Sequence, residues 1–212
     1  MKKDFTELVF ILDKSGSMSG LEKDTIGGFN SLIEKQKKES GEAVVTTVLF
    51  NHMLETKHDR VDLKKVKKFT SKDYVVSGCT SLLDAVGTTI SSISATHKQL
   101  KDDAPEKTIV IITTDGMENS SKEYTYDKVK KLIDRQKKKN WEFLFLGANI
   151  DVAMEARRFG IDDDKAVKYA CDKEGVMLNY CCLGEAVTNV RLGKSLDASW
   201  KKKIEEDYES RK

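Results

Sequence analysis

The sequence predicts an α/β fold with a doubly wound, mostly parallel central sheet and helices on both faces. Its apolar residues cluster in short runs that are typical of buried strands. Segments with apolar residues at helical spacing separate these runs, and no repeat, low-complexity linker or second domain interrupts the alternation. Strands that alternate with helices form parallel sheets covered on both sides. The predicted strands are residues 8–12, 43–50, 107–114, 141–146 and 166–170.

The helical segments are recognised by apolar residues three or four positions apart. In the first of them Ile26, Phe29, Leu32 and Ile33 share one face, and Ser40-Gly41 follows as a stop signal. The same spacing predicts five further helices. The expected helices cover residues 21–38, 62–69, 81–100, 126–139, 152–159 and 175–192.

One short segment is a weaker candidate for a strand. Residues 53–58 follow the turn Asn51-His52, directly after the strand at residues 43–50. A chain that turns back so tightly pairs with the preceding strand in the antiparallel direction. We therefore expect one antiparallel strand at the edge of the sheet.

Composition limits the classes of function. The 212 residues are 39% hydrophobic and 34% charged, and the formal net charge is only +2, so nothing drives the whole chain toward nucleic acid or anionic membranes. No stretch reaches the roughly 18 apolar residues that span a bilayer, and no signal peptide follows Met1. The expected location is cytoplasmic. The four cysteines form no zinc framework and are expected to be reduced: Cys79, Cys171, Cys181 and Cys182.

The strongest functional signal is Asp13-Lys14-Ser15-Gly16-Ser17, directly after the apolar run at residues 8–12. The carboxylate and the two hydroxyls then lie at the carboxyl end of a strand, where open α/β sheets place their ligands. Gly16 permits a sharp bend that turns both serines toward one point. Oxygen donors of this kind suit a hard divalent cation, above all Mg²⁺.

Two further segments agree with this signal. Thr80 lies in Gly78-Cys79-Thr80-Ser81, at the expected start of a helix, and Asp115 follows the strand that ends in Thr113-Thr114. The order Asp-x-Ser-x-Ser, then Thr, then Asp resembles the metal-ion-dependent adhesion site (MIDAS) of von Willebrand factor A (VWA) domains, and the order of elements agrees over residues 5–190. The resemblance implies a Rossmann-like VWA fold. It also implies a Mg²⁺ site, with Mn²⁺ as a substitute, at Asp13, Ser15, Ser17, Thr80 and Asp115.

Three flanking residues are predicted to lie around this site. Asp84 follows Thr80 by one helical turn and either holds a metal-bound water or faces the loops. Glu118 is expected to shape the rim and the choice of partner. Lys14 is expected to point to solvent and to attract an acidic partner.

The resemblance also implies a function. The chain resembles a stand-alone, intracellular VWA protein of the compact kind common in bacteria, with a VWA-like domain at residues 1–195. Such a domain mediates metal-dependent protein–protein interaction as an adaptor or assembly factor, and a carboxylate of the partner completes the metal shell. The implied partner is an AAA+ ATPase or the product of a neighbouring gene, and no catalysis is expected.

The tail, residues 196–212, has a different composition. It is rich in charged residues, with Trp200, Ile204 and Tyr208 at four-residue spacing. This spacing gives one apolar stripe on a polar helix. The helix is expected either to lie on the domain or to dock a partner or a second copy.

Two alternatives remain open. A metal-dependent phosphohydrolase also uses acidic residues at strand ends, but the Asp-x-Asp pair of the haloacid dehalogenase-like enzymes has Ser15 in its second position here. A component of a nucleic-acid-binding particle would use the lysine runs at residues 64–68 and 137–139. A solvated surface is the favoured reading of both runs.

Overall fold

Six strands form one sheet in the order β3-β2-β1-β4-β5-β6. All neighbouring strands are parallel except the pair β2·β3, which is antiparallel. This computed structural model describes residues 1–211, and it confirms the predicted α/β class and the antiparallel edge strand. The strands are β1 (Lys2–Asp13), β2 (Glu42–Phe50), β3 (Leu54–Asp62), β4 (Pro105–Thr114), β5 (Trp141–Gly147) and β6 (Ala166–Lys168).

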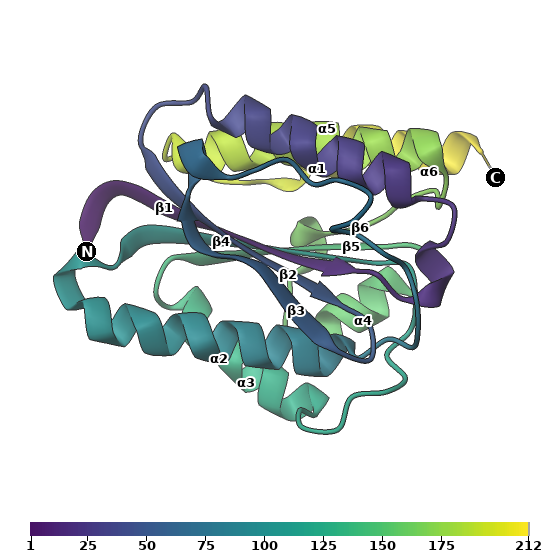
Figure 1. Cartoon of the computed structure of the whole chain (residues 1–212), viewed down its shortest axis with the longest axis horizontal. Coiled ribbons are helices and arrows are strands. Elements are labelled where there is room, and N and C mark those ends of the chain that lie inside the picture. Colours follow the sequence, from purple (N-terminus) through teal and green to yellow (C-terminus); the bar gives the residue numbers. More distant parts are fainter. Residues whose placement is uncertain (212) are drawn as a thin grey trace.

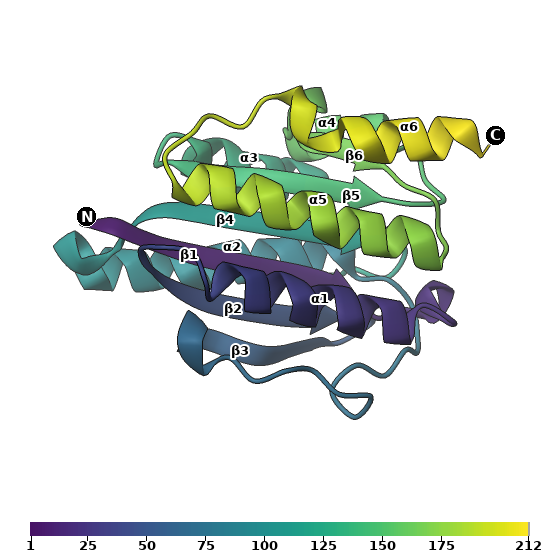
Figure 2. The same cartoon turned by 90° about the horizontal axis from the view of Figure 1, so that it is seen from above.

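Helices cover both faces of this sheet (Figures 1 and 2). In β1, Leu8, Phe10 and Leu12 face the core beneath α1 and α5, whereas Val9 and Ile11 face the core beneath α2, α3 and α4. Because side chains of a strand alternate between faces, a strand buried on both sides is apolar throughout. The helices are α1 (Glu22–Gln36), α2 (Leu82–Leu100), α3 (Tyr126–Lys137), α4 (Val152–Phe159), α5 (Lys173–Arg191) and α6 (Lys202–Ser210).

The strand order places a topological switch point beside β1. From β1 the chain continues through α1 to β2 on one side, while β4 pairs with β1 on the other side. The parallel register aligns Asp13 with Phe50 and Leu12 with Thr113, so these strands end at the same edge of the sheet. In open α/β sheets this crevice is the preferred ligand site.

The predicted helix over residues 62–69 is wrong. Only Leu63–Lys65 form a 3-10 turn, Val66 after it is extended, and residues 67–70 have no regular secondary structure. Leu63, Val66 and Phe69 are all buried, which explains the helix-like spacing. The Asn30 side chain holds this segment instead of helical hydrogen bonds, because its amide donates to the Phe69 carbonyl (2.9 Å) and accepts from the Phe69 N–H (2.8 Å).

The strand ends also differ from those predicted. The edge strand β3 extends to Asp62 rather than to His58, and it contains register shifts opposite Val45–Val48. Arg60 in this strand has a φ of +49°, which a regular strand does not allow. The last strand, β6, ends at Lys168 and is two residues shorter than predicted.

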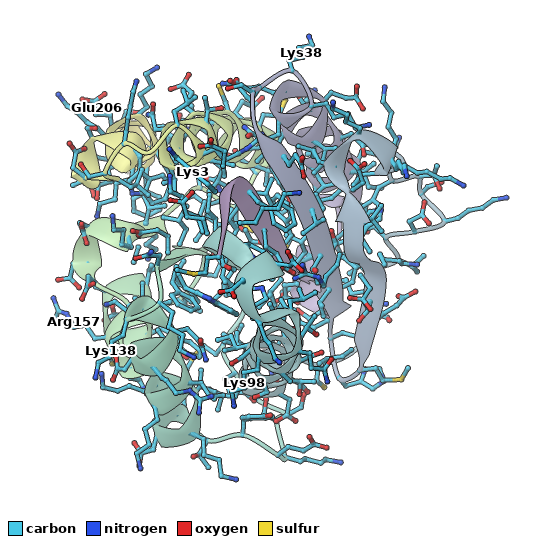
Figure 3. All side chains as sticks on the ribbon, turned by 90° about the vertical axis from the view of Figure 1, so that its left-hand side faces the viewer. Lys3, Lys38, Lys98, Lys138, Arg157 and Glu206 are labelled. Atoms are coloured by element: carbon cyan, nitrogen blue, oxygen red, sulfur yellow. The ribbon has the colours of Figure 1, made fainter. Side chains whose placement is uncertain are left out.

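The C-terminal segment packs on the domain. Trp200 and Ile204 are buried in the same core as α1 and α5, and the Ile204 side chain is 1% exposed. The boundary predicted at residue 195 stays a prediction, and Lys212 lies outside the described residues. Charged side chains such as Lys38, Lys138 and Glu206 project outward from separate elements (Figure 3). Across residues 1–211, no helix is both long and apolar enough to cross a bilayer.

Candidate metal centre

The ends of β1 and β4 bring two carboxylates to the switch point. Asp13 is the last residue of β1, and Asp115 directly follows β4. Their exposed fractions are 0% and 1%. Two acidic side chains are thus buried together at the carboxyl edge of the sheet.

The loop after β1 turns its serines toward these carboxylates. The Ser15 amide donates to Asp13 Oδ1 (2.7 Å), and Gly16–Met18 form a 3-10 turn. The Ser15 and Ser17 Oγ atoms lie 3.1 Å apart, and Ser17 Oγ donates to Asp115 Oδ1 (2.5 Å). One tight turn therefore joins both carboxylates through hydroxyl groups.

Thr80 enters the same cluster from the loop before α2. Its N–H donates to Asn119 Oδ1 (2.9 Å), and its carbonyl accepts from the Asn119 N–H (3.0 Å). A Cβ atom at Gly116 would lie 3.2 Å from both Ser17 Oγ and Thr80 Oγ1. Gly116 thus lets the two hydroxyls approach from different loops, and all five predicted donor residues belong to one oxygen-rich cluster.

The electrostatics of the cluster are unbalanced. Burial raises the pKa of Asp13 to about 6, the nearby charge of Asp115 adds to this, and hydrogen bonds from Ser15 and Thr114 partly oppose it. Burial also raises the pKa of Asp115. Among residues 1–211, neither carboxylate forms an ion pair with a Lys, Arg or His side chain, and Lys14 pairs with Glu55 instead. The pair therefore carries negative charge that the side chains around it do not neutralise.

This donor set fits a divalent cation of the hard class. Two carboxylates balance a 2+ charge, and the three hydroxyls add neutral oxygen ligands, which Mg²⁺ accepts together with water. In the described part of the chain, no three His, Cys, Asp or Glu side chains are grouped so that they could hold a metal ion.

The expectation that Lys14 points to solvent is wrong. Its Nζ donates to Glu55 Oε2 on β3 (2.6 Å), and its side chain is 14% exposed. The backbone explains this orientation, because the Lys14 N–H extends the pairing with β2 by donating to the Phe50 carbonyl (2.7 Å). The side chain is thereby directed over the β2–β3 hairpin.

Asp84 and Glu118 connect the second and third loops. Asp84 accepts hydrogen bonds from the backbone N–H groups of residues 122–124 (2.8–2.9 Å). Glu118 accepts from the Leu83 N–H (2.8 Å) at the start of α2 and from Ser121 in its own loop. Both carboxylates thus fix the two loops that carry Thr80 and Asp115.

Three contacts of the centre were not predicted. Thr114 Oγ1 donates to Asp13 Oδ2 (2.6 Å), the Tyr74 hydroxyl donates to the Asp13 carbonyl, and the Cys171 thiol lies 3.9 Å from Asp115 Oδ2. A polar Thr at the end of an apolar strand was the available signal for Thr114. Tyr74 and Cys171 lie far away in sequence and carry no such signal.

Comparison with solved structures identifies proteins of similar fold. The PilB minor pilin from Streptococcus sanguinis superposes with a TM-score of 0.63 at 12% identity, over 87% of this chain and 61% of the pilin chain. The manganese-loaded Plasmodium vivax TRAP protein gives 0.57 at 14% identity, over 82% and 72%. Proximal thread matrix protein 1 from the mussel byssus gives 0.56 at 13% identity, over 89% and 46%.

Sequence comparisons add no relative, since no family model and no curated protein matches the chain. The chain spans less than two thirds of the pilin and of the byssus protein. At 12–14% identity the likeness is one of fold. Strand order, the antiparallel edge strand and these comparisons together give the chain a von Willebrand factor A-like α/β fold.

Proposed function

We propose that the chain binds Mg²⁺, or Mn²⁺ in its place, and uses the bound ion to attach a partner protein. The observation that carries this proposal is the pair of buried carboxylates beside linked hydroxyl groups, neither of which has an ion-pair partner among residues 1–211. A divalent ion supplies the missing charge. The proposed ligands are Asp13, Ser15, Ser17, Thr80 and Asp115.

The partner is proposed to contribute a carboxylate. Neutral hydroxyl ligands leave the ion electrophilic, and Mg²⁺ keeps exchangeable water positions. Gly16 and Ser17 are exposed at the centre, and Met117 beside it is 67% exposed. An acidic side chain of a partner thus has access to the ion, while exposed apolar surface lies next to it.

This chemistry favours an adaptor or assembly role over catalysis. A phosphohydrolase of the Asp-x-Asp type needs a second carboxylate where Ser15 stands. The manganese-loaded TRAP protein shares the fold, which is consistent with a divalent ion in this chain. We propose a stand-alone, cytoplasmic, bacterial-type adaptor whose partner is an AAA+ ATPase or a gene-cluster neighbour.

Metal binding is tested first by thermal unfolding in increasing MgCl₂ or MnCl₂ against EDTA. Ligand linkage predicts a melting temperature that rises with metal concentration. Ser17→Ala removes a proposed ligand and should weaken this rise, whereas Ser19→Ala removes an exposed hydroxyl two residues away and should preserve it. An equal rise in wild type and Asp13→Ala would contradict the site.

Partner binding is tested by capture from a lysate of the source organism. Wild type in Mg²⁺ is compared with wild type in EDTA and with Asp13→Ala in Mg²⁺. A protein retained only in the first case supports the proposal. A protein retained equally in all three binds another surface and contradicts the metal-dependent mode.

A further inference from the structure

A pocket of about 460 Å³ opens between β3 and the extended segment that follows it. Its wall carries Lys57, Lys65, Lys67 and Lys68, and we call it the lysine pocket. Lys57 belongs to the edge strand, while the other three lie in the stretch that was predicted to be helical. The extended chain therefore brings these lysines to one concave surface.

Positive charge is concentrated in this region. Residues 57–73 contain seven Lys or Arg and three Asp, a net charge of +4, whereas the whole chain carries +2. A local excess of this size raises the concentration of anions near the surface. The remainder of the molecule is therefore slightly acidic.

Three of the four lysines of the pocket lack internal counter-charges. Lys57 pairs with Glu55 (2.6 Å). Within residues 1–211, Lys65, Lys67 and Lys68 have no carboxylate at ion-pair distance.

Two acidic groups lie near the pocket, and neither forms an ion pair with Lys65, Lys67 or Lys68. Asp73 on the pocket wall accepts hydrogen bonds from the Thr70 N–H (2.8 Å) and hydroxyl (2.7 Å). The Glu34 carboxylate pairs with Lys37 (2.9 Å), which lowers its pKa, and the nearby charge of Lys68 lowers this pKa further. Lys65, Lys67 and Lys68 are thus exposed without an ion-pair partner, while Asp73 keeps one negative charge on the pocket wall.

The other lysine run has a different environment. Lys137 pairs with Asp162 (2.6 Å) and donates to the Gly160 carbonyl (3.3 Å). Lys138 projects outward from the end of α3 (Figure 3). This run is therefore a matched control for the lysine pocket, with three lysines but part of its charge compensated.

The backbone of the lysine pocket is held in place. Asn30 makes two hydrogen bonds to Phe69, and Lys37 Nζ donates to the Val66 carbonyl (2.9 Å). The Phe69 ring stacks on His58 and on Phe29, with centroid distances of 5.4 and 4.4 Å. A fixed scaffold lowers the entropy cost of binding a ligand.

We propose that the lysine pocket binds a chain of phosphate groups. Ammonium groups are common point-charge partners of phosphate, and three unpaired lysines within four residues suit a ligand with repeated negative charges. Such a ligand is either the backbone of a single-stranded nucleic acid or a short polyphosphate. This site is separate from the metal centre and does not depend on the proposed function.

The test uses fluorescence anisotropy of a labelled 12-nucleotide oligouridylate with the full chain in EDTA, so that no metal ion bridges the probe to the metal centre. If three phosphates are neutralised, binding weakens about 20-fold between 50 and 200 mM salt. The triple variant Lys65→Gln, Lys67→Gln, Lys68→Gln should bind at least tenfold more weakly at 50 mM salt. The control triple variant Lys137→Gln, Lys138→Gln, Lys139→Gln should stay within about twofold of wild type.

Competition with inorganic tripolyphosphate identifies the source of the phosphate. Displacement of the probe at equal phosphate concentration supports a short polyphosphate ligand, and retention of the probe supports a nucleic-acid backbone. Equal loss of binding in both triple variants would mean diffuse attraction and would overturn the proposal. Absence of binding by wild type at 50 mM salt would also overturn it.

Discussion

The middle and the carboxyl end of β1 each bury a carboxylate, and the two differ in how the charge is compensated. Glu7 and Asp13 are both 0% exposed. Glu7 forms an ion pair with Arg60, lies 2.7 Å from His97 Nε2 and accepts from the Thr46 hydroxyl (3.1 Å). Asp13 has only amide and hydroxyl donors and lies near a second carboxylate.

This difference separates a structural acid from a functional one. Burying a charge costs free energy unless partners replace its hydration, and Glu7 finds those partners on β2, β3 and α2. Asp13 has no such charged partners, so the free-energy cost of burying its charge remains, and burial raises its pKa. Groups with such shifts cluster at functional sites, where a ligand provides the compensation.

Replacing Glu7 should cause the largest loss of stability. Glu7→Gln leaves Arg60 and His97 without their carboxylate, and breaking a buried pair lowers the free energy of unfolding by about 3–5 kcal/mol. Urea unfolding in EDTA at pH 7.5 measures this change. The exposed pair Lys2–Glu42 provides the control, since Glu42→Gln should cost under about 1 kcal/mol. Equal effects of the two variants would remove the distinction between the two buried carboxylates of β1.

Replacing Asp13 should have the opposite sign. Asn keeps the shape without the charge, and a folded pKa of about 6 against 3.8 corresponds to at most about 3 kcal/mol of destabilisation by the ionised form. Asp13→Asn should therefore raise the free energy of unfolding in EDTA at pH 7.5 and abolish stabilisation by Mg²⁺. A variant that is less stable than wild type in EDTA would show that the Asp13 charge is compensated after all.

The pH dependence of wild-type stability tests the same charge while all proposed metal ligands are still present. Because the folded pKa of Asp13 lies above its unfolded value, the folded state binds the proton more tightly. Its contribution to the free energy of unfolding is full below about pH 4 and is lost as the pH rises to about 6. The difference between wild type and Asp13→Asn isolates this term, because all other groups are shared.

Magnesium should reverse the direction of this pH dependence of stability. The ion binds the ionised carboxylate, so stabilisation should grow from pH 5 to 7 and reach about 2.7 kcal/mol at 100 times the dissociation constant. Unfolding curves at several pH values with and without MgCl₂ measure it. A magnesium effect independent of pH would place the ion elsewhere.

Separation along the sequence explains which of these features the sequence could predict. Asp13, Ser15 and Ser17 lie within five residues after an apolar strand, so the sequence alone predicted both the strand and the donors. The partners of Glu7 are 39, 53 and 90 positions away, and no local pattern links them.

The helix predicted at residues 62–69 is wrong for a related reason. Its buried residues match a helical period, but a side chain from α1, Asn30, decides the backbone conformation. The spacing of apolar residues within one segment gives no information about a partner that comes from another element.

The smallest effect is expected at Lys14, the cation next to Asp13 in sequence. Its ammonium group pairs with Glu55, whose side chain is 42% exposed, so Lys14→Gln should lower the free energy of unfolding by no more than about 1 kcal/mol. Stabilisation by Mg²⁺ and the pH window of Asp13 should stay as in wild type, because this charge is directed to β3. The same unfolding curves measure both. If Lys14 instead compensated Asp13, its removal would raise the pKa of that carboxyl and move the window to higher pH. Such a shift would make the two buried carboxylates of β1 alike, each with a cation of its own.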